Sequence, residues 1–198
     1  MILCIHLSTS LAQDLYYIIE SLCEESMPET TPDKSAREFL ATRKTLTMGT
    51  VGANGVPTAS YAPFVRQGDN FYVYTSALSR HTSDLKETGL ASILLVEDKM
   101  TANNLFARKR ITFSCNVTII ERGSGKWQDI INLFGDTFGK RFDIIRPLGD
   151  FTLFCLTPTE AVYVEGFGRA YRMNAHLRSP VHIKGVGPRA SALGDEKN

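Results

Sequence analysis

The middle of the chain begins with three apolar, β-branched runs that are separated by turn residues. Asn54-Gly55 and Gly68-Asp69 have the composition of hairpin turns. Pro63 lies inside the second run and interrupts its hydrogen-bond ladder. The pattern predicts an antiparallel meander of three strands at residues 46–51, 57–65 and 71–76.

Polar segments of helical length lie before and after this meander. Ser35 is followed by Glu38, the spacing of a capping box, and predicts a short helix over 35–42. A polar segment at 79–88 ends at Gly89 and predicts a second helix. Apolar residues at helical spacing predict a third helix over 126–138, and a helical turn is expected at 103–106.

The remaining apolar runs predict further strands. Residues 91–97 are continuously apolar, which is typical of a strand buried on both faces. A long strand is expected at 109–121, and two more at 151–158 and 161–168. Six or seven mainly antiparallel strands with inserted helices predict a mainly β fold, an antiparallel barrel. We expect an N-terminal leader (1–34), one barrel domain (35–172) and a flexible C-terminal arm (173–198).

Composition narrows the class of protein. The 198 residues are 43% hydrophobic and carry a net charge of +1, which gives no reason to expect a nucleic-acid partner. No apolar run reaches the length of a membrane span. The four cysteines form no Cys-x-x-Cys pair and the four histidines are scattered, so we expect reduced thiols in a cytoplasmic protein and no local zinc motif.

The first 26 residues do not have the composition of a signal peptide, because His6 and Asp14 interrupt the apolar stretch. They fit either an amphipathic helix or a misassigned start. Met27 opens a polar leader that suits the rest of the chain better.

Three adjacent cations begin the strand expected at 109–121. Side chains alternate along a strand, so Arg108 and Arg110 share one face and Lys109 takes the other. The three residues fit either a solvated strand end or an anion site. Arginine suits a carboxylate because its planar fork donates two hydrogen bonds.

A second polar cluster surrounds the start of the helix at 79–88. Ser76, Arg80 and neighbouring hydroxyl groups precede or open this helix, and a helix N-terminus favours phosphate or carboxylate. Ordinary capping by Ser79 explains the same pattern. His81 lies beside this cluster, and Asp150 precedes a strand as turn residues commonly do.

Several phrases of the sequence resemble one family. RKTL (43–46), SYAPFV (60–65), RHTSDL (80–85), LFARKRITF (105–113), LGDFTLFCLTP (148–158) and VEGFGRAY (164–171) occur in the order found in flavin-binding split barrels that include pyridoxamine 5′-phosphate oxidase. They are most similar to the haem-utilisation branch, the HugZ/HutZ type, which binds and degrades haem on a split-barrel dimer. The resemblance covers roughly residues 35–172.

The resemblance implies roles for individual residues. In the haem branch the arginine matching Arg110 pairs with a haem propionate or supports bound oxygen, and the histidine matching His81 lies close to the cofactor. The aspartate matching Asp150 hydrogen-bonds the proximal histidine, often across the dimer, and so tunes the iron. In the flavin enzymes, Ser76 and Arg80 match the region that holds the flavin phosphate.

The C-terminal arm departs from the branch. A Gly-His pair commonly supplies the iron ligand there, whereas this chain has Gly187-Pro188. Proline cannot bind iron, which leaves His182 and His176 as candidate ligands.

The resemblance implies a homodimer with haem as substrate, oxygen-dependent haem degradation and an external electron donor. An FMN-dependent oxidoreductase and a non-catalytic haem carrier are the alternatives. Residues Arg110 and Asp150 are the expected catalytic residues, and the expected cofactor-binding residues are Ser76, Arg80, His81, Arg108 and Arg110.

Overall fold

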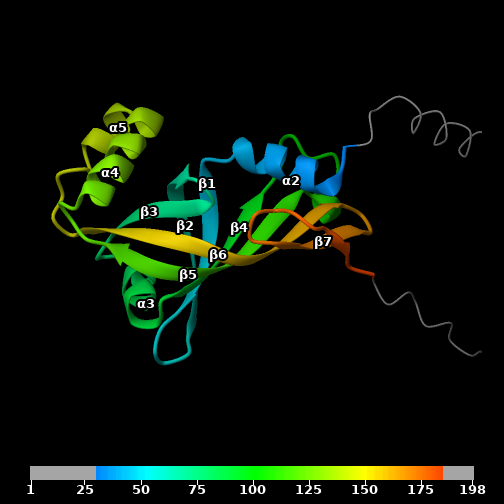
Figure 1. Cartoon of the computed structure of the whole chain (residues 1–198). Helices are drawn as coiled ribbons and strands as arrows, with labels where there is room; N and C mark the ends of the chain where they lie inside the picture. The colour runs from blue at the N-terminus through cyan, green and yellow to red at the C-terminus, as the bar shows by residue number, and fades with distance from the viewer. Residues whose placement is uncertain (1–29, 185–198) are drawn as a thin grey trace, which may run out of the picture. The chain divides into compact units, whose positions relative to one another are not determined.

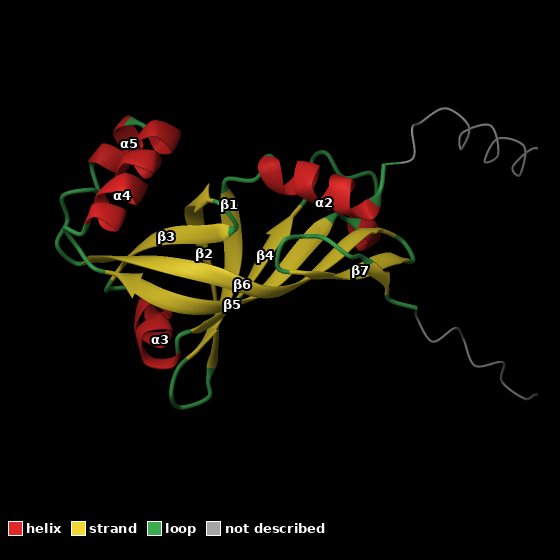
Figure 2. Cartoon of the chain, in the orientation of Figure 1, coloured by secondary structure: helices red, strands yellow, loops and turns green. Residues whose placement is uncertain are grey.

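The computed structural model describes residues 30–184, and Figures 1 and 2 show the arrangement of their helices and strands. The elements follow one another as α2 (Pro32–Ala41), β1 (Thr45–Val51), β2 (Pro57–Gln67), β3 (Asn70–Ser76), α3 (Arg80–Thr88), β4 (Leu90–Val96), η1 (Leu105–Ala107), β5 (Arg110–Ile120), α4 (Gly125–Phe138), α5 (Lys140–Asp143), β6 (Phe151–Gly166), β7 (Arg169–Asn174) and β8 (Val181–His182). No helix among the described residues is long and apolar enough to cross a membrane.

An antiparallel barrel organises the chain. The strand order is β3-β2-β1-β4-β5-β6-β7-β8, and an additional pairing of β3 with β6 closes the first six strands on themselves. Closure removes the free edges of those six strands, while β7 and β8 extend the sheet beyond β6. The prediction of a mainly β antiparallel barrel with inserted helices is therefore confirmed.

The barrel interior is the main hydrophobic core. Met48, Ile93 and Phe113 point into it, and each is at most 1% exposed. Leu40 of α2 and Leu85 of α3 join the same core. Helix α2 precedes the start of β1, whereas α3 is bonded to Thr50 near the end of β1 (Figure 1). Helix α2 thus holds the segment before β1 against the barrel, and helix α3 does the same for the segment after β3.

A second core lies outside the barrel. Here α4 and α5 cover one end of β3 and β6, and Ile130 and Phe134 pack on Tyr74 and Leu153. The Ser124 hydroxyl accepts a hydrogen bond from the Trp127 N–H (3.1 Å) and so caps α4 at its first turn. This core explains why the first half of β6 is buried on both faces.

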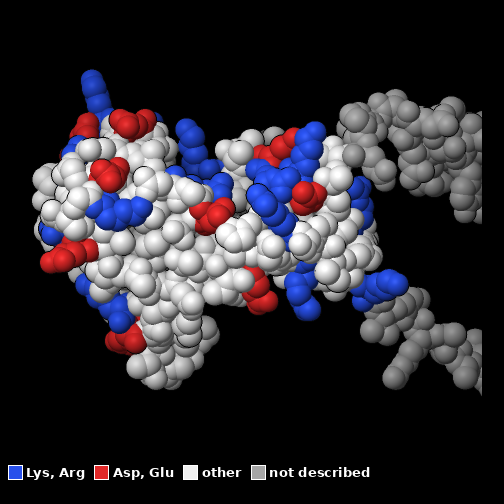
Figure 3. All heavy atoms as spheres, viewed as in Figure 1, with Lys and Arg blue, Asp and Glu red and all other residues white. Residues whose placement is uncertain are grey.

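A broad part of the sheet has no cover on its outer side. The pairings of β2 with β1, β1 with β4 and β4 with β5 bring side chains of these four strands together on this surface. These side chains are exposed or half-buried. We call it the open sheet face; it comprises Thr45, Thr47, Tyr61, Ser92, Leu94, Arg110 and Thr112. In the view of Figure 3, Lys and Arg gather near α2 and β7, while the surface over β5 and β6 is mostly uncharged.

Two strand predictions are wrong. The run at 91–97 forms β4, but its side chains alternate between buried and accessible, because only its inner side faces the core and its outer side belongs to the open sheet face. The segments 151–158 and 161–168 are not two strands but parts of the single strand β6, which continues through a β-bulge opposite Ser114 and Cys115.

The boundaries of the remaining elements differ by a few residues. Helix α2 begins at Pro32, inside the segment expected as a leader, and the residues from Met173 onward continue into β8. Residues 1–29 and 185–198, with the alternative start Met27 and with Pro188, lie outside the described residues.

Candidate functional site

Ser76 and Asp150 are brought together by the pairing of β3 with β6. Ser76 lies opposite Phe151 in that pairing, so Asp150 immediately precedes the first pair. The Ser76 hydroxyl donates a hydrogen bond of 2.6 Å to the Asp150 carboxylate, and the Ala77 N–H donates to the Asp150 carbonyl (2.9 Å). The Leu78 N–H in turn donates to the Ser76 hydroxyl oxygen (3.2 Å). These hydrogen bonds therefore fix Asp150 beside the exposed segment that connects β3 to α3.

Arg80 opens α3 and faces a carboxylate on the same helix. Its Nε lies 3.8 Å from Oδ1 of Asp84, one turn further on. The Asp84 side chain is almost fully buried and accepts a hydrogen bond from the Thr50 hydroxyl of β1 (2.8 Å). The Thr50 hydrogen bond lowers the pKa of Asp84, and Thr58, Arg80 and His81 add to this effect against the opposing influence of burial. Ionised Asp84 thus links α3 to the end of β1 through its hydrogen bond with Thr50.

We expect that Asp84→Asn lowers the melting temperature by several °C at pH 7. The folded-state pKa of Asp84 lies below the value of 3.8 for the unfolded chain, so ionised Asp84 stabilises the fold above that pH. This stabilisation is lost as the pH falls through the folded-state pKa. The difference between the variant and the wild type should therefore shrink below pH ~4 in melting curves recorded from pH 3 to 7.

Asp136→Asn, at an exposed position of α4, is the control and should match the wild type across the range. A difference between Asp84→Asn and the wild type that is constant with pH would show that ionised Asp84 does not contribute in this way.

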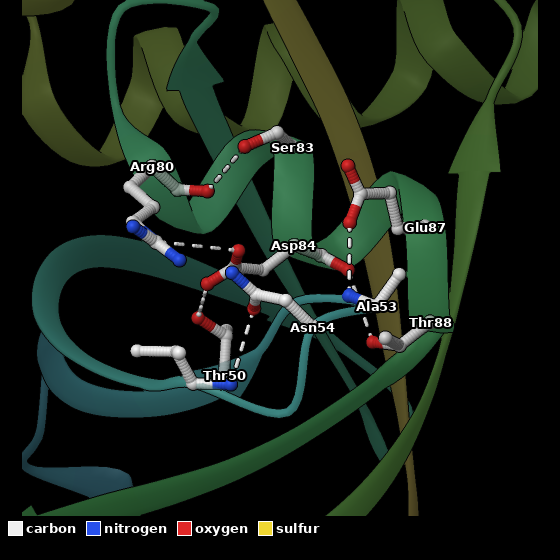
Figure 4. Close-up of polar contacts among 9 residues, drawn as sticks. Thr50, Ala53, Asn54, Arg80, Ser83, Asp84, Glu87 and Thr88 are labelled. Atoms are coloured by element: carbon white, nitrogen blue, oxygen red, sulfur yellow. Dashed lines mark hydrogen bonds and ion pairs between the residues drawn. The ribbon is translucent and has the colours of Figure 1, made fainter.

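The tip of the β1–β2 hairpin and α3 enclose a cleft of about 540 Å³ (Figure 4). Glu87 accepts a hydrogen bond from the Ala53 N–H (3.0 Å), which holds the hairpin tip against the helix. A Cβ at Gly52 would lie 3.0 Å from a carboxylate oxygen of Asp84, so a larger residue would require that carboxylate to shift by a few tenths of an ångström. The cleft has one cation, Arg80, facing two carboxylates.

His81 is buried beside this cleft. It is 8% exposed, and its Nε2 has no hydrogen-bond partner among the described residues. Burial lowers the pKa of His81, and the nearby Asp84 carboxylate offsets part of that effect. The imidazole is therefore neutral near pH 7 and lies inside the contact of α3 with the barrel.

Ser79 occupies the N-cap position of α3 but makes no capping hydrogen bond with its side chain. The helix ends at Gly89, whose φ of 65° is left-handed, as the sequence predicted.

Arg110 opens β5, and Arg108 lies two residues earlier, at the C-cap of η1. Arg110 is paired with Val96 of β4 and belongs to the open sheet face, and its Nη1 donates to the Arg108 carbonyl (3.1 Å). Arg108 lines a hollow of about 530 Å³ on the same face, together with Thr47 and Tyr61. The Arg108 guanidinium donates to the Glu97 carbonyl, while its Nε is buried without a hydrogen-bond partner among the described residues. The hydrogen bond from Arg110 to the Arg108 carbonyl keeps the two arginines close to one another.

Within the single chain, these two predicted clusters lie apart. Arg110 lies at the level of Thr45 on β1, as the β4 pairings show, whereas α3 is bonded to Thr50. Five residues of strand span about 17 Å. The group at α3, with Ser76, Arg80, His81 and Asp150, is therefore separated from the pair Arg108 and Arg110.

The two candidate iron ligands lie in the C-terminal segment, apart from each other. The His176 Nδ1 lies 2.6 Å from the Asp69 carboxylate. The His182 Nε2 donates to the Gly168 carbonyl (2.8 Å), and its ring makes an edge contact with Tyr171. Both histidines are exposed, and among the described residues their ring nitrogens contact Asp69 and the Gly168 carbonyl rather than Asp150.

Arg122 is a residue that sequence reasoning missed. It donates to the Leu148 carbonyl (2.9 Å), the Phe151 carbonyl (2.8 Å) and the Tyr74 hydroxyl (2.9 Å). Its guanidinium also lies over the Trp127 ring at 5.3 Å. Arg122 therefore fixes both ends of the loop that carries Asp150. A single arginine at a strand end gives no such indication in the sequence.

Asp84 was missed as well, although the sequence contained an indication. It lies four residues after Arg80, the spacing of a helical ion pair, and follows two hydroxyl residues in a helix with few apolar positions. Within the described residues, no three His, Cys, Asp or Glu side chains gather into a metal site.

Comparison with known proteins places this geometry in a family. The family model for pyridoxamine 5′-phosphate oxidase matches residues 32–165. Heme oxygenase HutZ of Vibrio cholerae serotype O1 is 41% identical over 149 residues, which cover 75% of this chain and 85% of that protein.

Solved structures give the same result. The crystal structure of Vibrio cholerae HutZ, described as a heme storage protein, has a TM-score of 0.62 and 40% identity over 64% of this chain and 89% of that chain. Campylobacter jejuni ChuZ has a TM-score of 0.73 and 27% identity over 89% of this chain and 72% of that chain. The chain therefore belongs to the split-barrel family of pyridoxamine 5′-phosphate oxidase and, within it, to the HutZ-type branch.

Proposed function

We propose that this protein binds haem and takes part in haem utilisation by oxygen-dependent haem degradation. The observation that carries the proposal is the 41% identity with heme oxygenase HutZ over 149 residues. The family model, which matches residues 32–165, includes both Arg110 and Asp150. The position of Arg110 on the open sheet face supports it. Haem is the substrate, its iron supplies the oxygen chemistry, and an external donor supplies the electrons.

A homodimer formed through the open sheet face would complete the site. This face has small, apolar and hydroxyl side chains such as Thr47 and Leu94, and few charges. A two-fold interface pairs a surface with itself, so opposite ends of the face meet across the axis. The α3 cluster of one protomer would thereby approach Arg110 of its partner. Neither cluster needs to move within its own chain.

The residues present suit the binding of haem propionates. Arg110 uses one Nη for the Arg108 carbonyl, and its remaining donors are available for a carboxylate. Arg108 lies at the same end of the sheet, where it lines the hollow on the open sheet face. Arginine binds carboxylates with charge-assisted, bidentate hydrogen bonds. We propose that these two arginines bind a propionate.

Asp150 would act on the histidine that ligates the iron. Its carboxylate already accepts from Ser76 and its loop is fixed by Arg122, so it has a defined direction and remaining lone pairs. An acceptor in this position orients an imidazole and raises its basicity. If His182 is that ligand, its Nε2 would have to leave the Gly168 carbonyl, so that one ring nitrogen binds the iron while the other donates to Asp150.

The electrostatics of the α3 cleft disfavour the flavin alternative. A flavin phosphate at Arg80 would meet the carboxylates of Asp84 and Glu87, with Asp150 close by. Like charges at short range oppose such binding. The remaining alternative, a haem carrier without turnover, would use the same Arg110 site and differs only in the fate of the bound haem.

The deciding experiment is an absorption titration of the purified protein with haemin and, separately, with FMN. We expect a sharp Soret band that saturates at one haem per subunit, followed by loss of the band when ascorbate or a reductase is added in air. His182→Ala should abolish or shift the band, and His176→Ala should leave it in place. No Soret change together with quenched FMN fluorescence would contradict haem binding, whereas a stable Soret band under reductant would identify a carrier.

A further inference from the structure

The outer side of the sheet continues from Arg110 across β6 and β7, the strands that follow β5 in the sheet. Val164 of β6 lies between Arg110 of β5 and Ala170 of β7. Two residues away along the strands, Val162 pairs with Arg172 of β7. Because alternate residues of a strand share a face, these five side chains lie on one side of the sheet.

The opposite side of β6 and β7 carries the core. Tyr163 and Met173, which alternate with the outer residues, are buried, and the Tyr163 hydroxyl forms a hydrogen bond with Ser35 of α2 (2.8 Å). Val162 and Val164 are therefore turned away from α2, and both are half-buried. We call the outer surface formed by Val162, Val164 and Ala170 the apolar strip.

Strand β8 widens the apolar strip beyond β7. Val181 pairs with Arg172, and the Ile183 N–H donates to the Ala170 carbonyl (2.7 Å). Val181 is 65% exposed and Ile183 is 38% exposed, so both present apolar surface to solvent. Apolar side chains on a sheet surface, with a few polar groups at its border, suit one face of a planar, largely apolar ring.

Arg172 is a cation at the border of this strip, and the protein does not neutralise it. It is exposed, and its side chain makes no hydrogen bond or ion pair among the described residues. The nearest acid in register is Glu160, the next outward residue of β6, whose carboxylate accepts from the Ser114 hydroxyl (3.3 Å). Arg110 also lacks an ion pair within the described part of the chain. Two accessible guanidinium groups thus stand against one carboxylate on this part of the face.

We infer that Arg172 binds the second propionate of haem, so that Arg110 and Arg172 each hold one carboxylate and the porphyrin covers the apolar strip. The two arginines are two strands and two residues apart, which places their Cα atoms about 12 Å from each other. Their long side chains can converge from this separation on two carboxylates that leave the same edge of one ring. Charge-assisted hydrogen bonds of this kind are strong and directional. The inference rests on the proposed binding of haem and adds to it a residue that recognises the second carboxylate.

The test is an absorption titration of the full-length wild type and of Arg172→Gln with haemin. The variant should have a Kd about tenfold higher, because a charge-assisted hydrogen bond is lost, and an unchanged melting temperature. Arg172→Lys keeps the charge and should recover part of the affinity. Arg178→Gln is the matched control, because it removes a cation from the exposed turn between β7 and β8, and it should bind haemin as the wild type does.

Haemin dimethyl ester separates recognition of the propionates from an effect on the protein. Esterification removes both carboxylate charges, so the wild type and Arg172→Gln should bind the ester with equal affinity in the same detergent buffer. A tenfold difference that persists with the ester would overturn the inference, because Arg172 would then act on the protein and not on a propionate.

The same titrations distinguish this inference from the proposed function. A wild type without a Soret band would contradict both. A saturating Soret band with the same Kd in the wild type and in Arg172→Gln would leave haem binding in place and remove only Arg172 from the site.

Discussion

Replacing Arg110 with alanine should weaken haem binding about tenfold to a hundredfold while leaving the fold intact. Hydrogen bonds to a charged group contribute about 1.5–3 kcal/mol, and removing the guanidinium leaves a propionate without its partner. Within the protein, the Arg110 side chain makes one hydrogen bond among the described residues, to the Arg108 carbonyl. Its loss should therefore affect the ligand far more than stability. The Kd from a haemin titration and the melting temperature measure the two effects separately.

Lys109→Ala is the matched control for Arg110→Ala. Lys109 is the neighbouring cation, and its backbone bonds to Glu97 keep it beside the strand whatever its side chain does. Alternation along the strand turns its side chain away from the face that holds Arg110. Haem affinity that falls equally in both variants would indicate a general effect of positive charge and would remove Arg110 from the site.

Leu94→Glu should convert the protein from a dimer into a monomer and abolish stable haem binding. Leu94 lies in the middle of the open sheet face, between Thr47 and Thr112. A two-fold interface would bring two copies of the new carboxylate into one buried surface, where unpaired charges cost several kcal/mol. Light scattering of the wild type should give twice the chain mass of 22.0 kDa, and the variant should give the chain mass.

Ile144→Glu is the control for this change. Ile144 is also apolar and 74% exposed, but it follows α5 outside the open sheet face. The variant should remain dimeric and bind haem as the wild type does. If Leu94→Glu became monomeric and still bound haem with full affinity, each protomer would contain a complete site. The proposal that the partner's Arg110 completes the site would then be wrong.

Local patterns in the sequence were sufficient to predict most of the barrel. The turn residues Asn54-Gly55 and Gly68-Asp69 and the alternation around them gave the β1–β3 meander to within a few residues. Helix α3 and its end at Gly89 followed from similarly local reasoning. These predictions succeeded because both the cause and the element lie within about ten residues of sequence.

Features that depend on distant partners could not be predicted in the same way. An apolar run such as that of β4 is compatible with one or two buried faces, and only the presence or absence of a covering layer decides between them. Helix α5 is too short for periodicity to reveal it. Strand β7 contains two arginines and follows a glycine turn, so it did not have the composition of a strand.

The candidate site shows the same division. The nearness of Arg108 and Arg110 follows from their adjacency, whereas the contact of Ser76 with Asp150 joins residues 74 positions apart and requires the β3–β6 register. Arg122 acts through carbonyl groups of the chain, which every residue has. Its role therefore leaves no trace in the residue types that surround it.

The bulge in β6 determines where this strand can change in length. Before the bulge Phe154 and Leu156 belong to the barrel core, and after it Ala161 and Tyr163 do. Thr159 has no partner on β5. The residues that point into the core therefore have even numbers before Thr159 and odd numbers after it. Deleting Thr159 would restore an unbroken alternation in which these core side chains still point inward, and only the local bend would be lost. Deleting one residue elsewhere in the strand would turn the inward set on one side of the deletion outward. Between Leu153 and Tyr163, a loss of one residue is therefore accommodated at position 159, and the other positions of this stretch can gain or lose residues only in pairs. A second register shift lies further on, between Val164 and Gly166.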